Sequence, residues 1–156
     1  MAASLERLGW RARAEAPSAQ QMLSARVVRA KAKSKACRVL LVEDESPVAE
    51  LYATVLKLHG HDVRVAPDGL AGLEAIRSGG FDLILVDIRM PRMDGLAMLR
   101  TVVAEETAIG TPVVILTNYD DVIFREEARN LGARDYLLKS RTMPQQLASL
   151  VSTWCH

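Results

Sequence analysis

The sequence predicts a doubly wound α/β domain built on a five-stranded parallel sheet in the order 2-1-3-4-5. From residue 37 onward, short apolar runs alternate with segments of helical periodicity, which is the pattern of a parallel sheet covered by helices on both faces. The first, third and fourth apolar runs are continuous, as in strands buried on both faces. The second run, at 62–66, alternates apolar and polar residues and therefore belongs at an edge of the sheet.

The elements of this (βα)₅ plan follow in order along the chain. Strands are expected at 38–42, 62–66, 81–86, 112–116 and 135–138. Each run is four to six residues long, as strands in globular domains usually are.

The intervening segments carry start and stop signals for helices. Ser46 is expected to cap the first helix, with a proline at the first helical position and Gly60 at the end. Asp68, Asp94 and Asp120 are expected to cap the next three helices. The last helix is expected to start after the proline at 144, and the buried stripe of the third helix is predicted to comprise Leu96, Leu99 and Val103.

Length and composition indicate one globular domain without a membrane span. The chain has 156 residues, about one ordinary domain, and is 49% hydrophobic and 25% charged. Its purely apolar runs are far shorter than the roughly 20 residues that a membrane-spanning helix needs. We therefore expect no transmembrane segment and a cytoplasmic location.

The charge is distributed unevenly along the chain. Residues 1–36 carry eight basic and two acidic side chains, a net charge of +6, whereas 37–156 carry a net charge of −5. We expect 1–36 to be a disordered or partly helical basic extension and 37–156 to be the domain. A membrane surface, nucleic acid or a targeting receptor would each attract such a segment. The favoured interpretation is a solvated extension, so nucleic acid is disfavoured as a partner.

The cysteines and histidines show no spacing typical of a metal or disulfide site. Cys37 and Cys155 lie near opposite ends of the domain, and we expect them to be buried or idle thiols in a reducing cytosol. His59, His61 and His156 have no companion ligands at metal spacing, and we expect all three at the surface.

Acidic residues follow two strands that the predicted sheet order makes neighbours. Glu43 and Asp44 follow the first strand, and Asp87 follows the third. Ligands of open parallel sheets bind at this end of the strands. Two carboxylates about 5 Å apart repel each other by roughly 3 kcal/mol at an effective dielectric constant of 20. A hard divalent cation would offset this repulsion, and Mg²⁺ is the ordinary choice for carboxylate, carbonyl and water ligands.

A lysine and a hydroxyl are expected at the same edge. Lys139 ends the fifth strand and Thr117 ends the fourth. A metal cation, an ammonium group and a hydroxyl together suit a phosphoryl group. A carboxylate beside them can act as a nucleophile and form an aspartyl phosphate, for which Asp87 is the best candidate.

Four motifs in order resemble the receiver domain of two-component response regulators. The run Val-Asp-Ile-Arg-Met-Pro-Arg-Met-Asp-Gly at 86–95 is similar to the family's phosphoacceptor loop. It is joined by Val-Glu-Asp-Glu at 42–45, Leu-Thr at 116–117 and Gly-Ala-Arg-Asp-Tyr-Leu-Leu-Lys at 132–139. The resemblance covers about 38–151 and implies the flavodoxin-like (βα)₅ receiver fold.

The resemblance implies a phosphoacceptor site. Asp87 would accept a phosphoryl group from a phosphohistidine on a sensor histidine kinase or a histidine phosphotransfer protein, in a Mg²⁺-dependent reaction that the receiver itself promotes. Glu43 and Asp44 would hold the metal together with Asp87 and the backbone carbonyl of Arg89. Lys139 would pair with a phosphoryl oxygen. The protein would be a regulator rather than an enzyme.

The resemblance also implies a switch. Thr117 would move to hydrogen-bond the phosphoryl group, Tyr136 would turn inward, and the face formed by the fourth helix, fifth strand and fifth helix would change shape for an unknown downstream protein. No output domain is expected after residue 151, which implies a single-domain regulator or phosphorelay intermediate. Homodimerisation stays open.

Two features depart from the commonest family pattern. Ser140 follows the lysine, where many members have proline. Arg89 and Tyr119 would both overhang the acyl phosphate and affect the access of water to it. The lifetime of the phosphorylated state is therefore not predicted.

Three alternatives are weighed against this interpretation. A phosphatase of the haloacid dehalogenase type would place Asp-x-Asp after the first strand, but residues 43–46 are Glu-Asp-Glu-Ser. A nucleotide or flavin binder of similar architecture would carry a glycine-rich phosphate loop there, and none is present in the sequence. The remaining alternative is a receiver-like scaffold that acts without phosphorylation; Asp87, Thr117 and Lys139 argue against it.

Overall fold

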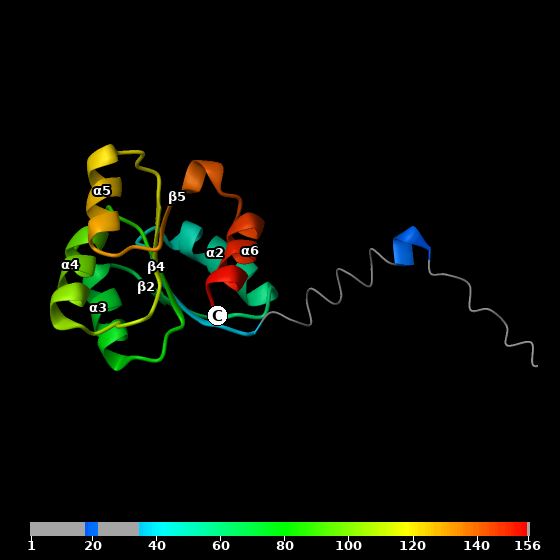
Figure 1. Ribbon diagram of the computed structural model, residues 1–156, viewed down its shortest axis with the longest axis horizontal. Helices are drawn as coiled ribbons and strands as arrows, with labels where there is room; N and C mark the ends of the chain where they lie inside the picture. Colours follow the sequence, from blue (N-terminus) through cyan, green and yellow to red (C-terminus); the bar gives the residue numbers. More distant parts are fainter. Residues whose placement is uncertain (1–17, 22–34, 156) are drawn as a thin grey trace, which may run out of the picture. The chain divides into compact units, whose positions relative to one another are not determined.

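A computed structural model describes residues 18–21 and 35–155 of the chain. The sheet and its helices belong to one compact unit, Ser34–His156 (Figure 1). Of the predicted basic extension, residues 18–21 are described: they form a helical turn in which Ser18 and Gln21 exchange two hydrogen bonds between backbone and side chain. The prediction for the rest of 1–34 lies outside the described residues.

The predicted sheet is confirmed. Five parallel strands lie in the order β2-β1-β3-β4-β5. Their bounds are β1 Arg38–Val42, β2 Asp62–Ala66, β3 Leu83–Val86, β4 Val113–Thr117 and β5 Asp135–Leu138. β3 begins two residues later than predicted, because Asp82 is used before the strand starts: its carboxylate accepts a hydrogen bond from the backbone N–H of Arg38.

Helices cover both faces of the sheet, as a doubly wound fold requires. They are α2 Ser46–Leu58, α3 Gly69–Ser78, α4 Gly95–Glu105, α5 Val122–Asn130 and α6 Pro144–Trp154, with a 3₁₀ turn η1 Lys139–Arg141 before α6. In Figure 1, α2 and α6 lie on one side of the sheet and α3, α4 and α5 on the other. Within the described residues, no helix combines the length and the apolar character that a bilayer crossing requires.

Alternate residues of the central strands supply two separate apolar clusters. Val39 and Leu41 of β1 pack toward α2 and α6, whereas Leu40 and Val42 pack toward α3, α4 and α5. This division follows from the two-residue repeat of a strand. It explains why β1, β3 and β4 have no polar face in the sequence.

The helix starts agree with the sequence prediction at two positions and differ at two. Asp68 and Asp94 cap α3 and α4 by accepting hydrogen bonds from Ala71 and Ala97. Asp121, not Asp120, caps α5. The prediction of Asp120 is wrong because adjacent aspartates give the same sequence signal; its carboxylate pairs with Arg125 instead. The N-cap of α2 is Glu45, not Ser46 as predicted, and Glu45 makes no side-chain capping hydrogen bond.

The prediction for the buried stripe of α4 is wrong at one position. Leu96 and Leu99 are buried, but Val103 is 48% exposed, and Val102 takes the inward position. Val102 lies three residues after Leu99 and Val103 lies four residues after it, and both spacings fit a helical repeat. Only packing against the sheet therefore decides which valine is buried.

The predictions for the cysteines and for one histidine are also wrong. Cys37 and Cys155 form a disulfide, because the fold brings the residue before β1 and the residue after α6 to a Cα–Cα distance of 6.1 Å across 118 residues of sequence. His61 is 4% exposed and therefore buried, because it precedes the edge strand β2 and packs beside Cys37. His59 is exposed, as expected, and the prediction for His156 falls outside the described residues.

Candidate functional site

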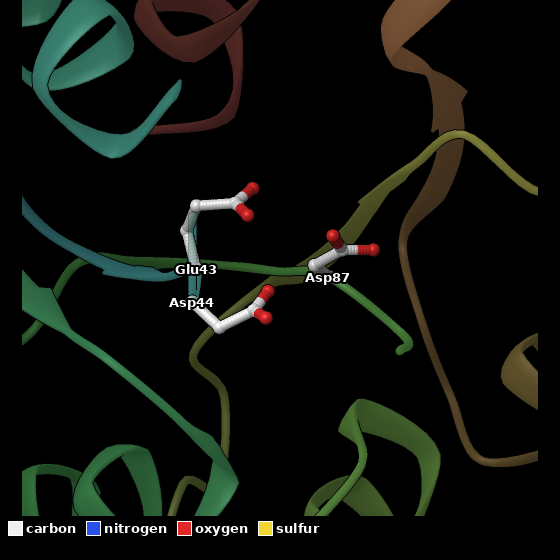
Figure 2. A group of neighbouring side chains, drawn as sticks. All are labelled: Glu43, Asp44 and Asp87. Carbon is white, nitrogen blue, oxygen red and sulfur yellow. The ribbon is translucent and has the colours of Figure 1, made fainter. Parts of the chain in front are cut away.

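Three carboxylates converge at the carboxyl ends of β1 and β3. Val42 and Val86 are paired in the parallel register, so the residues that follow them leave the sheet side by side. The backbone N–H of Asp87 donates to the carbonyl of Val42 at 3.0 Å, which fixes this aspartate against the end of β1. Carboxylate oxygens of Glu43, Asp44 and Asp87 all lie within 4.8 Å of one another, and Figure 2 shows the three side chains turned toward a common space.

Lys139 bridges two of these carboxylates. Its ammonium nitrogen lies 2.5 Å from a Glu43 oxygen and 2.7 Å from an Asp87 oxygen. The lysine reaches them because Leu138 of β5 is paired with the last residue of β4, and Lys139 follows directly. Burial disfavours the charge on Lys139, but the hydrogen bonds that its ammonium group donates to Asp87 and Glu43 outweigh this effect and raise the pKa of the lysine.

Glu43 remains short of positive charge despite this contact. Its carboxylate is buried, and burial is the main reason that its pKa is raised; the lysine lowers it and the neighbouring Asp87 raises it further. One ammonium group contacts two of the three clustered carboxylates, so a second cation would be stabilised at this point.

The donor set fits Mg²⁺. All the nearby ligands are carboxylate oxygens, which hard divalent cations prefer, and Asp44 is partly exposed so that water can complete the coordination. Among the described residues, no thiol or imidazole belongs to this cluster; such ligands would favour a softer metal.

Thr117 and the aromatic residues lie along one side of the site. Thr117 ends β4 and is completely buried, and its hydroxyl accepts a hydrogen bond of 3.4 Å from the backbone N–H of Tyr119. The guanidinium of Arg89 lies 4.3 Å from the centre of the Tyr119 ring. The two residues expected to overhang the acyl phosphate are therefore in contact with each other.

Tyr136 is tied to the same loop. Its hydroxyl donates a hydrogen bond of 2.6 Å to the carbonyl of Tyr119, and the guanidinium of Arg125 lies 4.4 Å from the ring centre. The ring is half-buried in this arrangement. Movement of Tyr136 would thus require the bond to residue 119 to break.

Close backbone packing holds the loop between β3 and α4. A side chain on Gly95 would clash with the carbonyl oxygen of Asp87, and one on Gly69 would clash with the carbonyl oxygen of Met93. The backbone N–H of Gly69 donates to that Met93 carbonyl at 3.1 Å. The loop that carries Asp87 is therefore fastened to the start of α3 as well as to α4.

Two contributors to the site are not apparent in the sequence analysis. Arg92 has a left-handed backbone with a φ of 67° and pairs with the buried carboxylate of Asp68, whose pKa is lowered by the N–H of Ala71 and by this arginine. Tyr52 of α2 is buried near the charged cluster, and burial raises its pKa. The capping pattern predicts the position of Asp68 but not its arginine partner.

Comparison with known families and curated proteins identifies relatives of this segment. The family model described as "Response regulator receiver domain" matches residues 39–151. The transcriptional regulatory protein DltR of Streptococcus agalactiae is 37% identical over 113 residues, covering 72% of this chain and 50% of that protein. ZraR of Escherichia coli is 36% identical over 118 residues, covering 76% of this chain and 26% of that protein. The chain thus spans half or less of the length of these relatives.

Solved structures share the fold. A CheY-like response regulator receiver domain protein from Methanospirillum hungatei superposes with a TM-score of 0.70 at 26% identity, covering 76% of this chain and 93% of the other. A response regulator described as putative, from Chloroflexus aurantiacus, gives a TM-score of 0.70 at 30% identity, covering 78% of this chain and 98% of the other. The predicted fold class is confirmed.

Proposed function

The chain belongs to the response regulator receiver family, and on that premise we propose that it accepts a phosphoryl group on Asp87. It comprises the receiver domain of a response regulator in two-component signalling, a family whose members are phosphoacceptors that interact with histidine kinases or phosphotransfer proteins. The observation that carries the proposal is the lysine shared between Glu43 and Asp87 at the meeting point of three carboxylates.

The proposed transfer is a displacement at phosphorus. A carboxylate oxygen of Asp87 attacks the phosphorus of a phosphohistidine, the P–N bond breaks, and the imidazole leaves with the electron pair. The attacking carboxylate is already oriented, because one oxygen accepts a 2.7 Å hydrogen bond from the N–H of Ile88 and the other accepts from Lys139. The ammonium group would then pair with the transferred phosphoryl oxygens, which carry more negative charge than the carboxyl oxygens of the resulting acyl phosphate.

Glu43, Asp44 and Asp87 would hold Mg²⁺, with the backbone carbonyl of Arg89 as a further ligand. Bound there, the ion supplies positive charge that offsets the negative charge of the phosphoryl oxygens. Glu43 supports this assignment because it is buried with too little cationic compensation of its own.

The switch is proposed to act through Thr117 and Tyr136. A phosphoryl group on Asp87 would attract the hydroxyl of Thr117, which at present accepts a long hydrogen bond from the Tyr119 backbone. A shift of that loop would weaken the bond between its carbonyl and the Tyr136 hydroxyl and release the ring. Arg89, stacked on Tyr119, would change its cover of the acyl phosphate in the same step.

The proposed partners are a sensor histidine kinase or a histidine phosphotransfer protein, followed by a protein that reads the α5-β5-α6 face. This face carries two exposed apolar side chains on α5, Val122 and Ile123, at 71% and 72% exposure. Exposed apolar groups that neighbour each other are typical of contact surfaces. Homodimerisation, a single-domain organisation and the domain boundary at residue 37 stay predictions.

The test is phosphorylation of the purified chain by a small-molecule phosphodonor. We expect one added phosphoryl group by intact mass in the presence of Mg²⁺, and none with Asp87→Asn or after chelation of the metal. Asp82→Asn is the matched control, because it alters a carboxylate at the other end of β3 and should leave the labelling unchanged. Equal labelling of Asp87→Asn would show another acceptor, and no labelling of a folded, Mg²⁺-binding chain would favour the scaffold alternative.

A further inference from the structure

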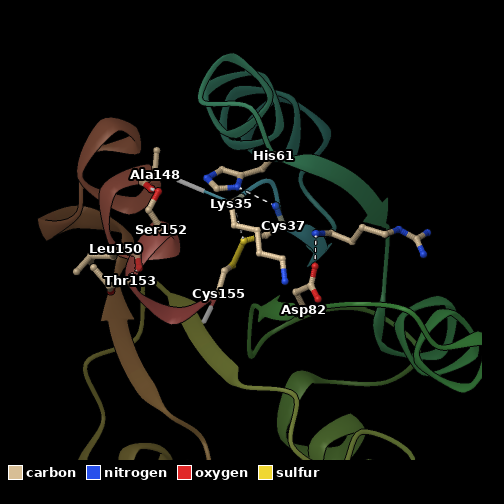
Figure 3. The surroundings of a disulfide bond; sticks show 10 residues. Lys35, Cys37, His61, Asp82, Ala148, Leu150, Ser152, Thr153 and Cys155 are labelled. Atoms are coloured by element: carbon tan, nitrogen blue, oxygen red, sulfur yellow. Dashed lines mark hydrogen bonds between the residues drawn. A yellow bond between two sulfur atoms is a disulfide. The ribbon is translucent and has the colours of Figure 1, made fainter. Parts of the chain in front are cut away.

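The disulfide joins two elements at the end of the sheet opposite the carboxylates. Cys37 directly precedes β1, and Cys155 directly follows α6. Figure 3 shows the bond crossing from the strand to the last turn of the helix, with His61 beside Cys37. Both cysteines are buried, at 2% and 7% exposure.

The fold places both cysteines independently of their bond. The backbone N–H of Cys37 donates to a ring nitrogen of His61 at 3.4 Å, and the carbonyl of Cys37 accepts a hydrogen bond of 2.8 Å from the backbone N–H of Asp62. The N–H of Cys155 donates to Val151 at 3.2 Å. Because their Cα atoms are 6.1 Å apart, within the 4.4–6.8 Å range usual for disulfides, opening the bond leaves two thiols at bonding range.

The apolar core does not depend on this covalent link. α6 buries Leu147, Ala148 and Val151 against the cluster that includes β1 and α2. A unit of this size builds a sufficient core without a disulfide, unlike small secreted domains. Buried thiols are also well tolerated, because cysteine behaves as a small apolar residue. The open form is therefore expected to stay folded.

The position of the bond links it to both halves of the phosphoacceptor site. β1, Arg38–Val42, connects Cys37 to Glu43, and Lys139 lies in η1, which precedes α6. The disulfide therefore joins the far ends of the strand that leads to Glu43 and of the helix that follows Lys139.

We propose that Cys37 and Cys155 form a reversible redox site that exchanges with low-molecular-weight thiols and disulfides. A small thiolate attacks one sulfur, the Sγ–Sγ bond breaks, and the other cysteine leaves as a thiolate that takes up a proton. A second small thiol attacks the mixed disulfide, giving two protein thiols and one small-molecule disulfide; two electrons and two protons are transferred. Cys155 is the more accessible of the two, at 7% against 2% exposure, and it ends a helix, where local opening would admit the attacking thiol. This site goes beyond the proposed phosphorylation and does not depend on it.

The test uses the full chain in glutathione buffers of graded ratio, with rapid alkylation and intact mass to count free thiols. We expect a reversible change from no free thiol to two along the series, with the circular dichroism spectrum unchanged at 20 °C. The reduced chain should melt about 10 °C lower than the oxidised chain, because the unfolded state is no longer cross-linked.

Cys155→Ser is the matched variant. It should melt like the reduced wild type and should not respond to the glutathione ratio. Two free thiols in every buffer, a bond that stays closed in excess reductant while the chain is folded, or equal melting of the two forms would each overturn the proposal. Because phosphorylation of Asp87 is measured separately, failure of one proposal is distinguishable from failure of the other.

Discussion

The two ends of the sheet are held together by different forces. At the carboxyl ends of the strands, Glu43, Asp87 and Lys139 are buried as ions that compensate one another. At the amino ends, Cys37 and Cys155 are joined within an apolar cluster. Burying charges is costly and often adds no net stability, whereas apolar burial is stabilising without a partner. The comparison indicates that charge compensation organises one end of the sheet and apolar burial the other.

The largest expected effect is at the charged end. Lys139→Met should lower the free energy of unfolding by about 3–5 kcal/mol, because it leaves two buried carboxylates without their cation. Urea denaturation measures this. The matched control is Arg100→Met, which breaks the exposed ion pair with Glu127 and should cost about 1 kcal/mol or less.

Addition of Mg²⁺ provides a second test of the same charged cluster. Saturating Mg²⁺ should stabilise Lys139→Met more than it stabilises the wild type, because the ion then compensates carboxylates that have lost the lysine. Two results would contradict the view that the buried lysine compensates this cluster. One is an equal loss of unfolding free energy in Lys139→Met and Arg100→Met, and the other is equal stabilisation of Lys139→Met and the wild type by Mg²⁺.

A slightly smaller effect is expected in the apolar cluster that contains the disulfide. Leu147→Ala removes a completely buried side chain from α6 and should cost about 3 kcal/mol, with phosphorylation of Asp87 retained at 10 °C. Leu150→Ala, on a partly exposed position of the same helix, should cost less. Loss of Asp87 phosphorylation in a folded Leu147→Ala chain would show that the charged site depends on the apolar cluster, which contradicts the contrast between the two ends.

Much of the charged end could be predicted because it depends on strand order. Once β1 and β3 are neighbours, the residues that follow them must meet, so the convergence of Glu43, Asp44 and Asp87 is determined by the apolar pattern of the strands. Lys139 follows from the same logic through β5. The roles of these residues stay predictions until phosphorylation is measured.

The amino end could not be predicted in the same way. The meeting of Cys37 and Cys155 depends on where α6 ends relative to β1, which no local pattern encodes over 118 residues. His61 is buried by that same packing. The pairing of Arg92 with Asp68 depends on a left-handed residue inside a loop, a conformation that sequence patterns do not assign to arginine.

The smallest expected effect is a pH dependence that belongs to the amino end. Burial, with a smaller contribution from His59, lowers the pKa of His61 below its usual 6.5. The unfolded chain therefore takes up a proton at a higher pH than the folded chain does. The stability that neutral His61 contributes is complete above pH 6.5 and is lost as the pH falls from there through the folded-state pKa.

Oxidised wild type should accordingly lose free energy of unfolding between pH 7.5 and 5.5 more steeply than His61→Asn, as measured by urea denaturation at each pH. His59→Asn is the control, because it leaves the buried imidazole in place and should keep most of the wild-type slope. Identical slopes in all three chains would mean that His61 is protonated within the folded domain. The amino end would then carry a buried charge, and the contrast between the two ends of the sheet would no longer hold.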